Sequence, residues 1–174
     1  MSGYQLNRLK IMVVDDNPHM RKVVFAILHG FGVHHVFEME SAEQAWGALG
    51  DVRPDVIFLD WMMTGMTGVE LTRLIRTNPA SPDPYVPIVM LTGHTSVEHV
   101  REARDAGVTE FLAKPVAARA ILSRLAAIIE APRPFVRTNV YFGPDRRRHN
   151  RDEYKGPERR DDIPNANNES TKVA

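Results

Sequence analysis

Three short runs of consecutive apolar residues constrain the fold of this chain most. They occupy residues 11–14, 56–59 and 88–91, and every position in each run is apolar. A strand that is apolar on both faces must be covered on both faces, as parallel strands are between two layers of helices. Amphipathic segments separate the runs, so we predict an open, doubly wound α/β domain built on a parallel sheet.

The remaining predicted elements complete this pattern. Two shorter apolar segments, residues 36–37 and 111–112, bring the number of predicted strands to five. Apolar residues at helical spacing, helix-capping residues and glycine stops predict helices near residues 18–31, 41–49, 71–75, 96–106 and 121–129. The first 131 residues therefore hold five successive strand–helix units.

The composition changes sharply after residue 131. Residues 132–174 contain only ten apolar residues among 43, with ten basic and seven acidic side chains. Such a segment buries too little apolar surface to build a core of its own. We therefore predict a globular domain over residues 8–131 and a largely disordered, arginine-rich tail over residues 132–174. The net charge of zero for the whole chain is a balance between an acidic domain and a basic tail.

Several classes of protein are excluded by what the sequence lacks. There is no cysteine, which excludes disulfide bonds, cysteine-ligated metal sites and thiol nucleophiles. No apolar run approaches the about 20 residues that span a bilayer, and the first ten residues lack the apolar stretch of a signal peptide. We expect a cytoplasmic protein with no membrane association.

Polar residues that could bind a metal or take part in a reaction follow the predicted strands. Asp15 and Asp16 follow the first strand, Asp60 the third and Thr92 the fourth, and Lys114 comes after the last. Taken singly, each has a plainer explanation, such as a helix cap or a turn. Parallel strands end at one edge of the sheet, however, so we expect all five side chains to gather there. Clustered carboxylates favour Mg²⁺, and one of them, Asp60, could act as a nucleophile toward a phosphoryl group.

With these residues at the ends of its strands, the chain resembles a known family, the CheY-like receiver domains of two-component response regulators. The resemblance covers about residues 8–130. It is carried by the motifs at residues 13–18, 55–63, 65–68, 87–93, 106–107 and 111–115. It implies a flavodoxin-like, five-stranded parallel sheet with the strand order 2-1-3-4-5.

The resemblance also implies roles at the metal site. Asp60 matches the residue that accepts the phosphoryl group. Asp16 matches a direct ligand of Mg²⁺, Asp15 a partner that acts mainly through water, and the backbone carbonyl of Met62 the third protein ligand. Because the Met62 side chain is apolar, it cannot orient an attacking water molecule, so we expect a long-lived phosphoryl group.

Three further positions match the phosphoryl-binding and switching residues of the family. Thr92 matches the hydroxyl that moves toward the phosphoryl group, and Lys114 matches the lysine that binds it, with a cis bond to Pro115. Phe111 matches the aromatic switch residue, although an ordinary core position is the alternative.

The partners implied by the resemblance are proteins. A histidine kinase or phosphotransfer protein would supply the phosphoryl group, and a downstream protein, such as a flagellar motor component or a kinase, would bind the activated domain. The tail contains no helix-turn-helix pattern, so we expect no DNA-binding domain. We expect a signalling phosphoacceptor with slow self-dephosphorylation and no other enzymatic activity. A phosphatase of similar topology would carry an Asp-x-Asp nucleophile motif after the first strand, whereas Asp15 and Asp16 are adjacent.

The tail contains an internal repeat of the form aromatic-x-Gly-Pro-acid-Arg-Arg, at residues 141–147 and again at residues 154–160. Arginine binds guanine edges and phosphates through two parallel hydrogen bonds, and aromatic rings stack on bases. The repeat resembles the arginine-rich tails of CheY-like effectors of cyclic-di-GMP. The predicted nucleotide-binding residues are Tyr141, Arg146, Arg147, Arg148, Tyr154, Arg159 and Arg160. The alternative is a phosphorelay receiver whose basic tail only tethers an acidic protein or a nucleic acid.

Overall fold

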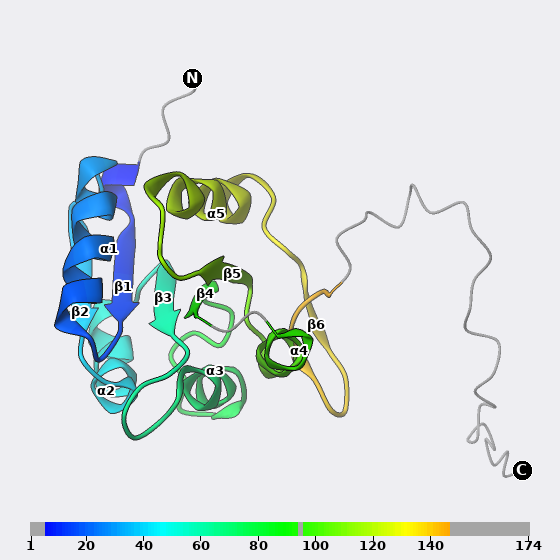
Figure 1. The fold of residues 1–174 in the computed structure, drawn as a ribbon. Coiled ribbons are helices and arrows are strands. Elements are labelled where there is room, and N and C mark those ends of the chain that lie inside the picture. Colours follow the sequence, from blue (N-terminus) through cyan, green and yellow to red (C-terminus); the bar gives the residue numbers. More distant parts are fainter. Residues whose placement is uncertain (1–5, 94–95, 147–174) are drawn as a thin grey trace, which may run out of the picture.

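The computed structural model describes residues 6–93 and 96–146. A central sheet of five parallel strands has the order β2-β1-β3-β4-β5, which confirms the predicted fold (Figure 1). The strands are β1 (Lys10–Val14), β2 (His35–Met39), β3 (Val56–Asp60), β4 (Ile88–Thr92) and β5 (Glu110–Ala113). A single 3₁₀ turn, η1 (Leu6–Arg8), precedes β1.

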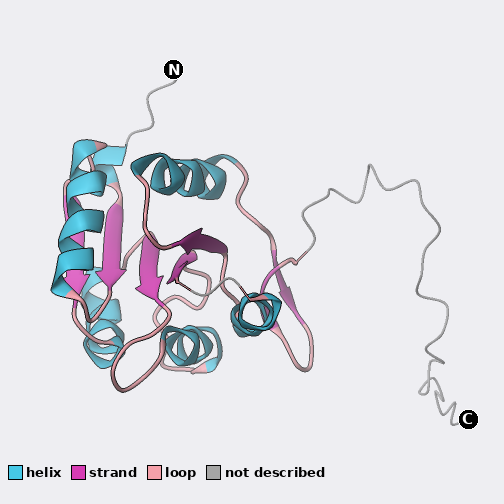
Figure 2. Cartoon of the chain, viewed as in Figure 1, coloured by secondary structure: helices cyan, strands magenta, loops and turns pink. Residues whose placement is uncertain are grey.

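Five helices cover the two faces of this sheet (Figure 2). They are α1 (Pro18–Gly30), α2 (Ala42–Val52), α3 (Gly68–Thr77), α4 (Val97–Ala106) and α5 (Ala118–Glu130). One core cluster joins α1 and α5 to one face, and the other joins α2, α3 and α4 to the opposite face. Both faces of β3 and β4 are buried throughout, which explains why these strands are continuous apolar runs.

Side-chain caps begin the helices that follow β1 and β3. The Oδ1 atom of Asn17 accepts a hydrogen bond from the backbone N–H of His19, 2.9 Å away, and Pro18 is the first residue of α1. Thr67 and Glu70 form a reciprocal capping box at α3. Such caps satisfy N–H groups that have no partner within the helix, and so they fix where α1 and α3 begin.

A small hairpin follows α5, and the sequence analysis did not predict it. Strand β6 (Phe135–Arg137) pairs antiparallel with β7 (Phe142–Pro144). The rings of Phe135 and Phe142 each lie 5.2 Å from the ring of Tyr85, between centroids. The prediction of disorder from residue 132 onward is therefore wrong for this hairpin, because its aromatic residues pack on the preceding domain rather than on a core of their own.

The rest of the tail, residues 147–174, lies outside the described residues. Among the helices of the described part, none combines the length and the apolar character needed to cross a membrane.

Candidate functional site

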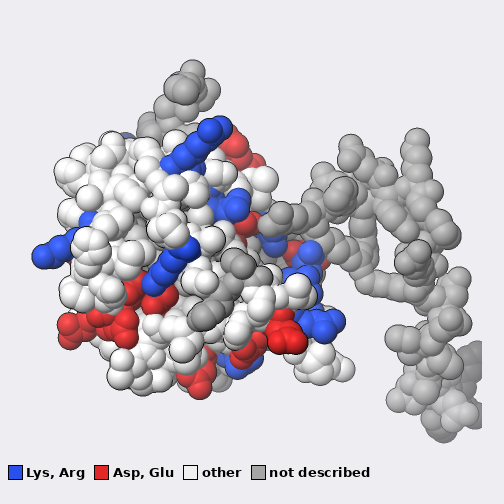
Figure 3. Space-filling view, viewed as in Figure 1, with Lys and Arg blue, Asp and Glu red and all other residues white. Residues whose placement is uncertain are grey.

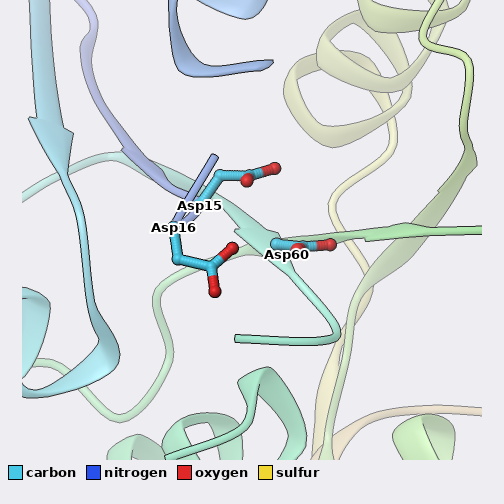
Figure 4. A group of neighbouring side chains, drawn as sticks. All are labelled: Asp15, Asp16 and Asp60. Atoms are coloured by element: carbon cyan, nitrogen blue, oxygen red, sulfur yellow. The ribbon is translucent and has the colours of Figure 1, made fainter. Parts of the chain in front are cut away.

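Three aspartates meet at the carboxyl edge of the sheet (Figure 4). Val14 pairs with Leu59 in the β1–β3 register, so the next residues on the two strands, Asp15 and Asp60, lie side by side. One carboxylate oxygen from each of Asp15, Asp16 and Asp60 can be chosen so that all three lie within 4.8 Å of one another. Asp15 and Asp60 are buried, whereas Asp16 is exposed.

A lysine from the end of β5 closes the other side of this cluster. The Nζ atom of Lys114 lies 2.7 Å from Oδ1 of Asp60 and 2.9 Å from Oδ2 of Asp15. The bond between Lys114 and Pro115 is cis, as the family resemblance implied. Because β5 and β1 are not neighbours in the sheet, this lysine reaches across the ends of the strands to join carboxylates from two of them.

Backbone and side-chain donors hold the two aspartates that follow β1. The backbone N–H of Asn17 donates to Oδ1 of Asp15 at 2.8 Å. The backbone N–H and the hydroxyl of Thr64 donate to Oδ2 of Asp16 at 2.9 and 3.2 Å. Thr64 was not predicted, because its contact with Asp16 spans 48 residues of the chain and leaves no local pattern.

The cluster raises the pKa values of two of its members. Burial raises the pKa of Asp60, the negative charge of Asp15 adds to the effect, and the hydrogen bond from Lys114 opposes it. Burial on its own would lower the pKa of Lys114, but the hydrogen bonds and charges of Asp60 and Asp15 outweigh it, so the pKa lies above its usual value. One ammonium group thus faces three carboxylates, and the site holds an excess of negative charge.

These residues fit a divalent cation of the hard, oxygen-binding kind. Mg²⁺ prefers carboxylate oxygens and retains water molecules in its remaining positions. Asp15, Asp16 and Asp60 provide such oxygens close together, and a cation would relieve the repulsion that Asp15 exerts on Asp60. Met62, whose backbone carbonyl is the further expected ligand, lies two residues after Asp60 and is exposed.

Thr92 and Phe111 lie where the sequence analysis placed them. Thr92 is buried at the end of β4, one residue beyond Leu91, which pairs with Asp60. Phe111 is partly buried and packs against the core cluster shared with α2, α3 and α4. Phe111 therefore contributes to core packing. It lies on β5, which pairs with β4, the strand that ends in Thr92.

Gly68 is part of the site although no role was predicted for it. A β-carbon at this position would overlap the backbone carbonyl oxygen of Asp60 and would lie 3.1 Å from Cγ of Leu59. The backbone N–H of Gly68 donates to the carbonyl oxygen of Trp61 at 3.0 Å. The start of α3 can approach the end of β3 this closely only because residue 68 has no side chain.

The tail residues that are described lie away from this edge of the sheet. Arg146 stacks on the ring of Tyr141, with its guanidinium carbon 4.0 Å from the ring centroid. It also forms an ion pair of 3.0 Å with Asp105 near the end of α4. The other predicted nucleotide-binding residues lie outside the described part of the chain, namely Arg147, Arg148, Tyr154, Arg159 and Arg160.

Comparison with known proteins identifies the family. The family model of the response regulator receiver domain matches residues 11–126. The chemotaxis protein CheY of Pseudomonas aeruginosa is 30% identical over 122 residues, which cover 70% of this chain and 97% of CheY. The phosphate regulon transcriptional regulatory protein PhoB of the same organism is 31% identical over 124 residues, 71% of this chain. This chain spans only about half of PhoB, 53% of its length.

Solved structures agree with these matches. The chemotaxis protein CheY4 of Vibrio cholerae superposes with a TM-score of 0.63 and 31% identity, over 69% of this chain and 98% of CheY4. The receiver domain of the histidine kinase CKI1 from Arabidopsis thaliana, solved in complex with Mg²⁺, gives a TM-score of 0.60 and 31% identity over 67% of this chain and 90% of that domain. The chain therefore belongs to the response regulator receiver domain family, and its receiver domain is CheY-like.

Proposed function

We propose that this chain is a response regulator of a two-component system, phosphorylated on Asp60 by a histidine kinase or a phosphotransfer protein in the cytoplasm. The observation that carries the proposal is the position of Asp60, buried at the end of the central strand β3 and 2.7 Å from the ammonium group of Lys114. In the proposed reaction a carboxylate oxygen of Asp60 bonds to phosphorus, the bond from phosphorus to the donor imidazole breaks, and the imidazole takes up a proton.

The surrounding residues would stabilise charge during this transfer. Bound Mg²⁺, held by Asp15, Asp16 and Asp60, would neutralise part of the negative charge that a phosphoryl donor brings into the site. Lys114 loses its carboxylate partner at Asp60 when the acyl phosphate forms, so its N–H groups become available to the phosphoryl oxygens. The hydroxyl of Thr92 lies on the same edge and can donate to them as well.

We infer that the phosphorylated domain signals through contact with another protein. The described residues comprise the receiver fold and the hairpin and include no DNA-binding domain. A flagellar motor component or a kinase is the proposed downstream partner.

The side chain of Met62 leads to a prediction about the lifetime of the phosphoryl group. Met62 lies two residues after Asp60 and is 59% exposed, but its thioether offers no strong hydrogen bond to water. Met62→Asn is expected to speed hydrolysis of the acyl phosphate roughly tenfold, less than the hundredfold or more that a positioned proton-transfer group typically contributes. The measurement is loss of the phosphorylated form, by intact mass, after removal of the donor. Met62→Leu is the matched control, and equal rates for all three proteins would contradict the role of residue 62.

We further propose that the tail binds cyclic-di-GMP. Two observations support this ligand: the repeated aromatic-x-Gly-Pro-acid-Arg-Arg unit in the sequence, and the stacking of Arg146 on Tyr141 in the first unit. A guanine base has a flat face for an aromatic ring or a guanidinium group, and its O6 and N7 atoms accept two hydrogen bonds from one arginine. The two units would then recognise the two guanines.

Calorimetry with cyclic-di-GMP tests this second proposal. The variant with Arg146, Arg147, Arg159 and Arg160 changed to Ala is expected to lose at least about 100-fold in affinity, since each two-bond contact to guanine is worth ~1–3 kcal/mol. Changing the same four residues to Lys keeps the positive charge but removes the planar guanidinium group. This variant should lose almost as much affinity as the Ala variant. No heat from the unchanged protein would favour the alternative, a tail that tethers an acidic protein or a nucleic acid.

A further inference from the structure

The hairpin of β6 and β7 contacts the carboxyl end of α4 directly through backbone atoms. Helix α4 ends at Gly107, which adopts a left-handed conformation with a φ of 101°. A β-carbon added to Gly143 in β7 would lie 2.5 Å from the hydroxyl oxygen of Tyr141 in the same hairpin and 2.9 Å from the Cα atom of Gly107. One added to Gly107 would lie 3.1 Å from the carbonyl oxygen of Phe142 and 3.0 Å from Cγ of Arg76. The backbone of β7 therefore packs closely on Gly107, and a side chain at Gly143 would have to displace Tyr141 or Gly107.

An ion pair reinforces this contact at the last described residue of the tail. Arg146 lies 3.0 Å from Asp105, in the last turn of α4, while its guanidinium group stacks on Tyr141. The hydroxyl of Tyr141 donates to the carbonyl oxygen of Pro144 at 2.7 Å, which fixes the ring under the arginine. Acidic and basic side chains meet on the surface where the hairpin lies beside α4 (Figure 3).

The opposite end of α4 contacts Trp61, the residue that follows Asp60. Ser96 caps the helix, and its hydroxyl lies 2.7 Å from Nδ1 of His99. The His99 ring packs edge-on against the ring of Trp61, with 5.4 Å between the centroids, and Trp61 directly follows Asp60. Helix α4 has ten residues, about 15 Å at 1.5 Å per residue. It thus joins the residue next to the proposed phosphoacceptor to the hairpin (Figure 1).

We propose that the hairpin is a clamp on α4 that couples the C-terminal tail to phosphorylation of Asp60. In the docked state the hairpin holds α4 against Trp61 in the arrangement of the unphosphorylated protein. Displacing the hairpin frees α4 and favours the phosphorylated state of Asp60 at equilibrium, and phosphorylation weakens the docking of the hairpin by the same equilibrium factor. This inference rests on the proposed function in taking Asp60 as the phosphoacceptor.

The hairpin covers a buried cation, and the burial of this charge opposes docking of the hairpin. Arg76 of α3 is only 3% exposed and lies beneath the ring of Phe135, with its guanidinium carbon 5.1 Å from the centroid. Its Nε and Nη1 atoms donate to the carbonyl oxygens of Gly107 and Pro84, but its Nη2 atom has no hydrogen-bond partner among the described residues. Burial lowers its pKa to about 10. The unfavourable burial of this charge offsets part of the aromatic packing.

A single glycine substitution in the full-length chain separates the clamp from the rest of the fold. Gly143→Ala places a methyl group against Tyr141 and against the backbone of Gly107, the two contacts that join the hairpin to the end of α4, and should release the hairpin. Trypsin cleavage after Arg137, which the paired strands of the hairpin protect, should become at least about tenfold faster. Phosphorylation of Asp60 by acetyl phosphate should become about fivefold faster, the low end of typical allosteric coupling.

Two other variants complete the experiment. Gly47→Ala, on the exposed side of α2 with no atom within 4 Å of the new methyl group, should behave as wild type in both assays. Asp105→Asn removes only the ion pair with Arg146 and should change both rates about twofold in the same direction, as expected for a partly exposed pair.

The possible outcomes separate the two proposals. A Gly143→Ala protein that is cleaved faster but is phosphorylated at the wild-type rate would overturn the clamp and leave the proposed function intact. Unchanged cleavage in both Gly143→Ala and Asp105→Asn would also overturn it, because the hairpin would then not be held through these contacts. A wild-type protein that accepts no phosphoryl group at all would overturn both proposals together.

Discussion

Asp60→Asn is expected to abolish phosphorylation while leaving the folded state at least as stable as wild type. The amide has no anionic oxygen to attack phosphorus, so incubation with acetyl phosphate and Mg²⁺ should add no phosphoryl group detectable by intact mass. Stability should survive because burial and the charge of Asp15 raise the pKa of the Asp60 carboxyl, which means that the charged form is poorly accommodated. Lys114 keeps its second partner, Asp15, at 2.9 Å.

Two comparisons make this result interpretable. The free energy of unfolding in urea should change by less than about 1 kcal/mol, which shows that lost phosphorylation is not lost folding. Asp51→Asn, an exposed position in α2, is the matched control and should be phosphorylated normally. An Asp60→Asn protein that still gains a phosphoryl group would place the phosphoacceptor elsewhere in the chain.

Gly68→Ala should produce the largest loss of stability among single methyl additions at the site. The new methyl group would overlap the carbonyl oxygen of Asp60, and backbone atoms at the junction of β3 and α3 must move to admit it. We expect a loss of about 2–3 kcal/mol in the free energy of unfolding, the upper part of the range of about 1–3 kcal/mol for overpacked positions. Urea denaturation measures this loss. The rate of phosphorylation by acetyl phosphate should fall in the same variant, since Asp60 itself is displaced.

The effect of a glycine-to-alanine change on the free energy of unfolding depends on the space around the glycine. Urea denaturation of Gly47→Ala tests this dependence. That glycine lies in the interior of α2 with open space around it, so alanine should stabilise the helix by up to about 1 kcal/mol. Opposite signs for the two substitutions are the expected result. Equal stability of Gly68→Ala and wild type would mean that α3 does not approach Asp60 as closely as the structure indicates.

The receiver fold and most of its site could be predicted from the sequence for a definite physical reason. Runs such as residues 56–59 are apolar on both faces, and a strand of that kind needs helices on both sides. Once the sheet is parallel, the polar residues that end its strands must share one edge. Asp15, Asp60, Thr92 and Lys114 therefore come together although they lie up to 99 residues apart.

Other parts of the site depend on contacts that leave no local pattern. Thr64 was not predicted to hold Asp16, and Gly68 was not predicted to touch Asp60, because each contact is defined by a loop whose path follows from the packing of α3. For Phe111, the sequence left a switch residue and a core position as alternatives. The structure shows the packing of its ring against the core, and the switch role stays a prediction.

The hairpin shows where prediction from the sequence ends and the tertiary structure is needed. By itself the sequence determined the layered α/β fold, the acidic edge and the repeat in the tail, because periodicity and the order of elements along the chain specify them. Only the tertiary structure decided that residues 135–144 fold, since the partners of Phe135 and Phe142 are Tyr85 and Arg76, about 50 residues or more earlier in the chain. A segment too poor in apolar residues to form a core of its own can still fold where an existing domain offers an aromatic surface.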